Sequence, residues 1–216
     1  MIESSRTVRR ILLAVVLGGC AESNGFTPAD SMLPTLAVGT RIDAKKVDGA
    51  PGRGRVIVFR APEAPDREYV KRVIGITGDT ISMNGTEVVL NGTPIFRCAV
   101  GAWRYAERDG SVRTGELWLE ALDGTTWLVF HDAAATSGPT GPWTVAPGEV
   151  FVFGDNREHS HDSRLWFGGK GGGLPLKLVV GGPAASPEPT LPIGAEPLAG
   201  ALRACAADAS RSRAPR

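Results

Sequence analysis

Residues 149–164 read EVFVFGDNREHSHDSR, an apolar run followed directly by a charged one. The first five residues have the alternating, aromatic-rich pattern of a β-strand, and a polar run of this kind is ordinarily a solvated loop. Two aromatic residues, Trp166 and Phe167, follow closely. Charge therefore lies between two apolar segments, beside what the pattern predicts to be the core. The pattern alone does not explain why so much charge is placed there.

Short strand-like segments separated by turn residues occur along most of the chain. Examples are TRIDAKKV, GRVIVFRA, EYVKRVIGI, GELWLEAL and TWLVFHD, with the hairpin signals LNGTP and LDGTT among them. With 28 Gly and 16 Pro in 216 residues, this pattern favours a mainly β fold of one domain with a small inserted lobe. A formal net charge of +1, without a lysine- and arginine-rich stripe, gives no support for nucleic-acid binding.

Both ends of the chain differ from its middle. In residues 1–22, arginines precede an apolar run, which is typical of an export signal. The run from Ile11 to Ala21 corresponds to about 16 Å of helix, against a hydrocarbon layer of about 30 Å. Two interpretations stay open: a membrane helix truncated by a misplaced start codon, or a lipoprotein signal in which LGGC leads to lipidation of Cys20. Residues 183–216 are rich in Pro, Ala and Ser and are expected to be disordered, with room for one short helix near LAGALRACAADA.

A serine and a lysine stand out as candidates for catalysis. Ser31 lies in DSMLPTL, just before a strand, and Lys71 lies inside the apolar segment YVKRVIGITGD. Most serines in such places are turn or cap residues, and most strand lysines point to water. Strand alternation, however, places Lys71 on one face with Tyr69 and Val73, where it would lose water. Desolvation lowers the pKa of a lysine, and a neutral amine can take the proton from a serine hydroxyl.

Three segments, in this order, resemble the motifs of the type I signal peptidase family. SMLPTL is similar to its nucleophile motif, YVKRVIGITGD to the motif that carries its base, and GDNREHSHDSR to its last motif; the similarity runs from about Phe26 to Gly182. Members of this family are membrane-bound serine endopeptidases that remove signal peptides from exported proteins. The resemblance implies a mainly β fold, in which a coiled β catalytic domain carries a smaller inserted β domain. It places the catalytic domain at residues 23–90 and 143–182, and the insertion at residues 91–142.

The resemblance also implies roles for individual side chains. Ser31 would be the nucleophile and Lys71 its general base. The Ser160 hydroxyl would hydrogen-bond the lysine and fix its direction, while Asp162 and Arg164 would form a buried pair that braces the loop. Further supporting residues in the same turn are Asp155, Asn156 and Arg157.

Substrate recognition is expected next to the nucleophile. The family prefers small residues at the first and third positions before the cut, which implies two shallow apolar subsites, with Met32 as a wall residue. Two positions before the nucleophile, one branch of the family has a Ser or Thr whose hydroxyl helps to bind the oxyanion, and another branch has Gly. In this chain Ala29 stands there, so the oxyanion would rest on backbone amides.

The implied partners are the signal peptides of preproteins and membrane lipid, with no nucleic acid, no cofactor and no metal. The implied location is the cell membrane, with the catalytic domain on its outer side, periplasmic or extracellular. In such an oxidising compartment Cys98 and Cys205 could form a disulfide. Sequence alone does not establish that they are close, and two unpaired thiols are the preferred expectation.

Other functions stay open from the residues alone. A Ser-His-Asp hydrolase could use Ser31 with His159 or His161 and Asp162, although Lys71 would then have no role. A self-cleaving repressor shares a Ser-Lys dyad but carries a DNA-binding helix-turn-helix, whereas this chain begins with an export-type segment. A non-catalytic protein could bind signal sequences without cleaving them. The HSHD segment is only a weak signal for a metal site.

Overall fold

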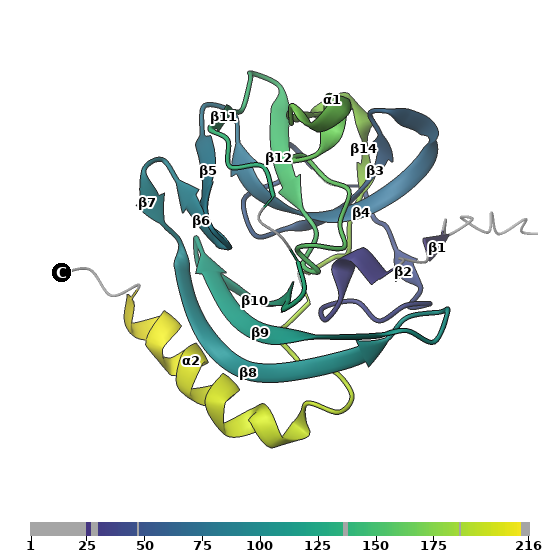
Figure 1. Ribbon diagram of the computed structural model, residues 1–216. Helices are drawn as coiled ribbons and strands as arrows, with labels where there is room; N and C mark the ends of the chain where they lie inside the picture. The colour runs from purple at the N-terminus through teal and green to yellow at the C-terminus, as the bar shows by residue number, and fades with distance from the viewer. Residues whose placement is uncertain (1–24, 27–29, 47, 136–137, 186, 213–216) are drawn as a thin grey trace, which may run out of the picture.

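The computed structural model describes residues 25–26, 30–46, 48–135, 138–185 and 187–212. Within them the chain is mainly β, which confirms the expected fold class, and its strands pair antiparallel throughout the described sheets (Figure 1). The largest sheet has the order β13 (Leu174–Pro175), β12 (Glu149–Phe153), β4 (Ala64–Ile76), β3 (Val56–Ala61) and β14 (Val179–Gly181). A four-stranded sheet has the order β11 (Trp143–Thr144), β5 (Thr80–Asn84), β6 (Glu87–Leu90) and β7 (Thr93–Pro94).

The remaining strands form two smaller sheets. A three-stranded sheet has the order β10 (Thr125–Asp132), β9 (Val112–Leu122) and β8 (Phe96–Ala106), and β1 (Gly25–Phe26) pairs with β2 (Ile42–Asp43). The short helices are η1 (Asp30–Met32), α1 (Trp166–Gly169), η2 (Leu176–Leu178) and η3 (Glu196–Leu198). A longer helix, α2 (Ala199–Ser212), follows η3.

The central strand of the five-stranded sheet, β4, carries Lys71. Its neighbours place Ile57 of β3 opposite Lys71 and Phe153 of β12 opposite Arg72. Residues 70–75 are all buried, because this half of the strand is covered on both faces. Most strand lysines point to water, but Lys71 is enclosed by the protein.

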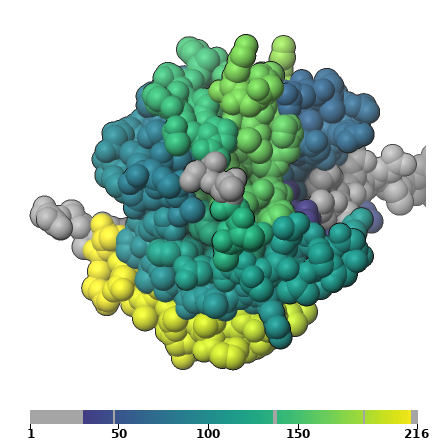
Figure 2. Space-filling view, in the orientation of Figure 1, coloured from purple at the N-terminus to yellow at the C-terminus, as the bar shows by residue number. Residues whose placement is uncertain are grey.

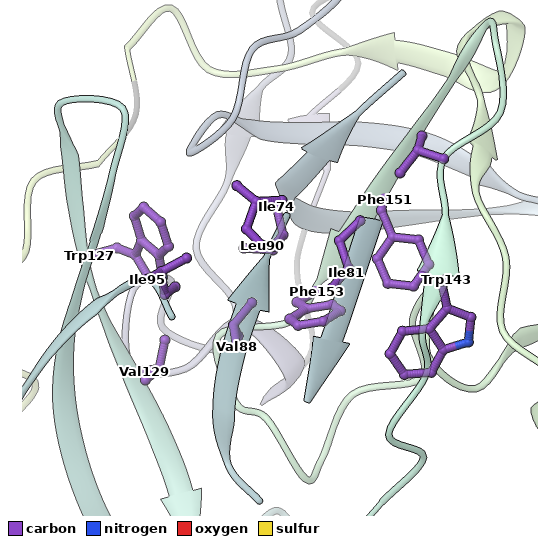
Figure 3. Packing of buried hydrophobic residues seen from close by; sticks show 11 residues of the cluster. Ile74, Ile81, Val88, Leu90, Ile95, Trp127, Val129, Trp143, Phe151 and Phe153 are labelled. Carbon is purple, nitrogen blue, oxygen red and sulfur yellow. The ribbon is translucent and has the colours of Figure 1, made fainter. Parts of the chain in front are cut away.

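One apolar core joins the three larger sheets (Figure 3). Phe151 and Phe153 of β12 pack in the same buried cluster as Trp127 of β10. Ile81 of β5 belongs to this cluster as well. Residues 91–142 therefore share a core with the strands around them, and their boundaries as an inserted domain stay a prediction.

The short helix that the sequence allowed near LAGALRACAADA is present as α2, and it is docked, so residues 199–212 are not part of a disordered tail. Helix α2 packs against β8 and β9 and covers the lower side of the molecule in the views shown (Figures 1 and 2). Its buried residues are Cys205 and Ala209, one turn apart, and Leu198, just before the helix, packs on Gly101 of β8. Residues at this spacing share one helix face, and this face is the one that docks on the sheet.

A disulfide joins Cys98 of β8 to Cys205 of α2, with their Cα atoms 5.5 Å apart. The preference for two unpaired thiols is therefore wrong. The pairing depends on the docking of α2 against β8, and no local sequence pattern reports that contact.

Removing this cross-link is expected to lower the free energy of unfolding by about 2–4 kcal/mol, because the disulfide closes a long loop in the unfolded chain. The measurement is urea denaturation of the protein and of its Cys98→Ser/Cys205→Ser variant. A reducing agent should shift the midpoint of the unmodified protein and leave that of the variant unchanged. Peptide mapping without reductant that finds both thiols free would contradict this assignment.

Every helix in the described part of the chain is too short or too polar to serve as a membrane span. The expected export signal at residues 1–22, with the lipidation candidate Cys20, lies outside the described residues. Both stay predictions from the sequence.

Candidate active site

Ser31 lies in η1, a single 3₁₀ turn. The next residue, Met32, fixes this turn to the core, because its side chain has no exposed surface and packs in a cluster with Ile42 and Val70. Met32 is therefore a buried anchor of the turn, and its expected role as a wall of a substrate subsite stays a prediction. Ala29, the other expected substrate contact, lies outside the described residues.

Lys71 reaches the nucleophile from β4. Its Nζ donates a hydrogen bond to Ser31 Oγ over 2.6 Å, and only 3% of the residue is exposed. Burial lowers the pKa of Lys71 to about 8, against the attraction of the Asp162 and Asp155 carboxylates. A large share of this lysine is therefore neutral in mildly alkaline solution and able to accept a proton.

Asp162 and Arg164 form a buried ion pair near the lysine. Arg164 donates from Nε to Asp162 Oδ1 (2.9 Å) and from Nη2 to Oδ2 (2.8 Å). The backbone N–H of Gly154 donates to the same carboxylate over 2.9 Å. Burial opposes ionisation of Asp162, but the charge and hydrogen bonds of Arg164 outweigh it and hold the pKa of this carboxyl below its ordinary value. The pair is thus ionised and nearly neutral as a unit.

Ser160 is placed differently from the expectation that its hydroxyl would bond the lysine. Its Oγ is buried and has no hydrogen-bond partner of ordinary geometry, and Lys71 Nζ bonds to Ser31 instead. The side chain lies against Gly154, which has no Cβ to displace it. The hydroxyl is also near Asp162 and helps to lower the pKa of that carboxyl. Ser160 therefore lies beside Gly154 and the Asp162 carboxylate.

A second buried pair, which sequence reasoning missed, joins Arg72 to Asp155. Arg72 donates from Nε to Oδ1 (2.9 Å) and from Nη2 to Oδ2 (2.7 Å), and the Thr35 hydroxyl donates to Oδ2 (2.5 Å). The guanidinium carbon also lies 4.8 Å from the ring centroid of Trp127. This pair ties β4 to the start of the charged loop. The sequence did contain an indication that Arg72 is buried, because strand alternation places it among apolar residues on the face opposite to Lys71.

The charged loop is also tied to the three-stranded sheet. Arg157 makes a bidentate pair with Glu120 of β9, and both residues are buried. The backbone N–H of Asn156 donates to Ser31 O (3.1 Å), and its side-chain Nδ2 donates to Tyr105 Oη of β8 (2.8 Å). Glu120 and Tyr105 belong to the expected insertion, and no motif marks them in the sequence.

The histidines of the loop have partners away from the nucleophile. His159 Nε2 lies 2.8 Å from Asp132 Oδ2, and His161 Nε2 lies 2.6 Å from Glu63 Oε2. Neither ring hydrogen-bonds the nucleophile, so the geometry gives no support to a Ser-His-Asp arrangement. In the described ranges, no three His, Cys, Asp or Glu side chains are grouped so that they could hold a metal ion.

A family model described as "Signal peptidase, peptidase S26" matches residues 4–195. The chain belongs to this family. A signal peptidase I of Pseudomonas aeruginosa is 34% identical over 156 residues, which cover 64% of this chain and 53% of that protein. A signal peptidase I of Bacillus caldolyticus is 34% identical over 145 residues, which cover 66% of this chain and 69% of that protein.

This member of the signal peptidase family spans about half the length (53%) of its relatives from Pseudomonas aeruginosa and Pseudomonas fluorescens. Among solved structures, a signal peptidase I from Enterococcus faecalis aligns with 62% of this chain and 97% of its own chain, at 23% identity and a TM-score of 0.36.

Proposed function

We propose that this chain is a type I signal peptidase, a serine endopeptidase that cleaves N-terminal signal peptides from exported preproteins with a Ser31/Lys71 dyad. One observation carries the proposal: Lys71 Nζ lies 2.6 Å from Ser31 Oγ, and the lysine is almost fully buried. Family membership supports the reaction class, and the site supplies a nucleophile and a base for it.

The proposed reaction is an acyl transfer. Neutral Lys71 accepts the proton of the Ser31 hydroxyl while Oγ attacks the scissile carbonyl. Backbone amides, including that of Ser31, stabilise the oxyanion. The protonated lysine then donates its proton to the leaving amine, which leaves an ester on Ser31. A water molecule that gives its proton to the same lysine hydrolyses this ester.

The buried ion pairs support this chemistry without reacting. Burial is the largest influence on the pKa of Lys71; Asp162 raises this pKa and Arg164 lowers it, so the two paired charges act in opposite directions at the amine. Burial therefore governs the protonation of Lys71, and the lysine keeps a base strength suited to a reaction near neutral pH. A single unpaired carboxylate in the same place would hold the lysine in its charged, inactive form.

The proposed location is the cell membrane, with the catalytic part on the outer side and with preprotein signal peptides and membrane lipid as partners. The disulfide between Cys98 and Cys205 supports a site outside the cytoplasm, because disulfides form and persist in oxidising compartments. The export-type sequence of residues 1–22 supports the same location.

The test is a cleavage assay on a peptide that spans a signal-peptide cleavage site, with alanine at the first and third positions before the cut. The unmodified protein should cleave that bond, and Ser31→Ala should not, while both proteins unfold at the same temperature. A peptide with tryptophan at the same two positions is the control and should stay intact. Tight binding of the first peptide by the unmodified protein without any cleavage would identify a signal-sequence binder instead.

A further inference from the structure

Tyr105 of the three-stranded sheet reaches the turn that carries the nucleophile. It lies at the end of β8, partly buried, with its ring stacked on Trp103 (5.3 Å between centroids) and edge-on to Phe130 (5.5 Å). These contacts hold the ring so that Oη lies 2.8 Å from Asn156 Nδ2. The hydroxyl is therefore fixed beside the charged loop by packing within its own sheet.

Asn156 links this hydroxyl to the nucleophile turn. Its Nδ2 donates to Tyr105 Oη and also to Asp30 O (3.2 Å), and its backbone N–H donates to Ser31 O (3.1 Å). Its Oδ1 is buried and has no hydrogen-bond partner. The orientation of the amide group therefore depends on its two N–H donors alone.

The backbone around Asn156 is held from β10. Phe130 N donates to Asp155 O (2.9 Å), and Arg157 N donates to Phe130 O (3.0 Å). Because the main chain is fixed on both sides of Asn156, its side-chain amide is the movable part of the link. Without the acceptor on Tyr105, the amide is free to rotate and to lose its bond to Asp30 O.

We propose that Tyr105 is a positioning residue for Ser31 and acts through Asn156; this inference rests on the proposed function. The Tyr105 oxygen accepts one amide hydrogen, which directs the other at Asp30 O. The turn is then held with Ser31 Oγ within 2.6 Å of Lys71 Nζ. The nucleophile is thus placed in part by the sheet β8–β10, which contributes neither of the two reactive residues.

Tyr105→Phe is expected to lower kcat by about tenfold and to change KM by less than about twofold, because a small displacement of the nucleophile slows the chemical step and leaves binding intact. Phenylalanine keeps the ring contacts, so the unfolding temperature should stay close to that of the unmodified protein. Ser210→Ala is the control. It removes a hydroxyl that donates to Ala206 O (3.0 Å) within α2, and it touches neither Tyr105 nor Asn156. It should leave both kcat and KM unchanged.

A double-mutant cycle tests the route through Asn156. Tyr105→Phe should slow the unmodified protein but have no further effect when Asn156 is already alanine. Tyr105 also lines a cavity of about 440 Å³ with Asp30 and Glu107, so direct contact with the substrate is the competing explanation.

If Tyr105 contacted the substrate directly, Tyr105→Phe would raise KM, and the losses of activity from Tyr105→Phe and Asn156→Ala would add in the double variant. That result would overturn the positioning role. An unchanged kcat in folded Tyr105→Phe would overturn it as well. The proposed function is tested separately in the same series: it fails if the unmodified protein does not cleave the peptide, whereas the positioning role is judged from the variants of a protein that does.

Discussion

Lys71→Met is expected to lower kcat/KM for a signal-peptide substrate by about 10³-fold or more, because it removes the general base. Methionine places an unbranched apolar side chain at a position that is only 3% exposed, so the fold should persist. The measurement is steady-state cleavage, with thermal unfolding of both proteins in parallel. Substantial cleavage by the folded variant would contradict the dyad mechanism.

The pH profile of the unmodified protein is a second measure of the same base. The lysine must be neutral to accept a proton, and burial lowers its pKa to about 8. The value of kcat/KM should therefore be low at pH values well below this pKa, rise through it and level off above it. A histidine base would instead give an inflection near about 6.5. Lys71→Arg is the matched control and should be inactive throughout, since a guanidinium keeps the charge but does not lose its proton.

Gly154→Ala is expected to lower kcat by about 10²-fold and the free energy of unfolding by about 1–3 kcal/mol. A Cβ at this position would lie 2.5 Å from both Ser31 O and Ser160 Cβ, and closer still to Ser160 Oγ. Neither the backbone oxygen nor the Cβ atom can move aside as the end of a flexible side chain can. The methyl group would therefore displace the nucleophile turn. Cleavage kinetics and urea denaturation of the variant are the measurements.

Gly52→Ala is the matched control for this substitution. A Cβ at Gly52 meets no atom within 4 Å, and its backbone, like that of Gly154, lies outside the left-handed region. The control should keep its kcat and change the free energy of unfolding by no more than about 0.5 kcal/mol. Full activity in folded Gly154→Ala would show that the nucleophile turn has room to adjust.

Local patterns explain which parts of the site could be predicted. The apolar run around Lys71 indicated a covered strand, and the resemblance to the family motifs implied the buried pair of Asp162 and Arg164. The partners of Arg157 and Asn156 were not predictable in this way. Glu120 is 37 residues from Arg157, and Tyr105 is 51 residues from Asn156. Only the pairing and packing of the sheets bring them together.

The C-terminal segment shows how an average can mislead. Residues 183–216 as a whole have the composition of a disordered tail, but their second half contains a 14-residue helix with buried residues four positions apart. The prolines of this segment lie before α2 or, in the case of Pro215, after it, where they do not interrupt the helix. The short helix was foreseen from its local sequence, but its docking against β8 was not, and the disulfide between Cys98 and Cys205 depends on that docking.

The core shared by the sheets restricts how this chain can be combined with its relatives. Trp127 is fully buried against residues of the five-stranded sheet, and Tyr105 and Glu120 contact the charged loop. A hybrid protein that exchanges β8–β10 as a cassette would have to import both its inward apolar face and these two polar contacts. Exchanges limited to the exposed residues 108–110 of the β8–β9 turn face neither demand. Chimaeras should therefore be built by swapping that turn and not the whole sheet.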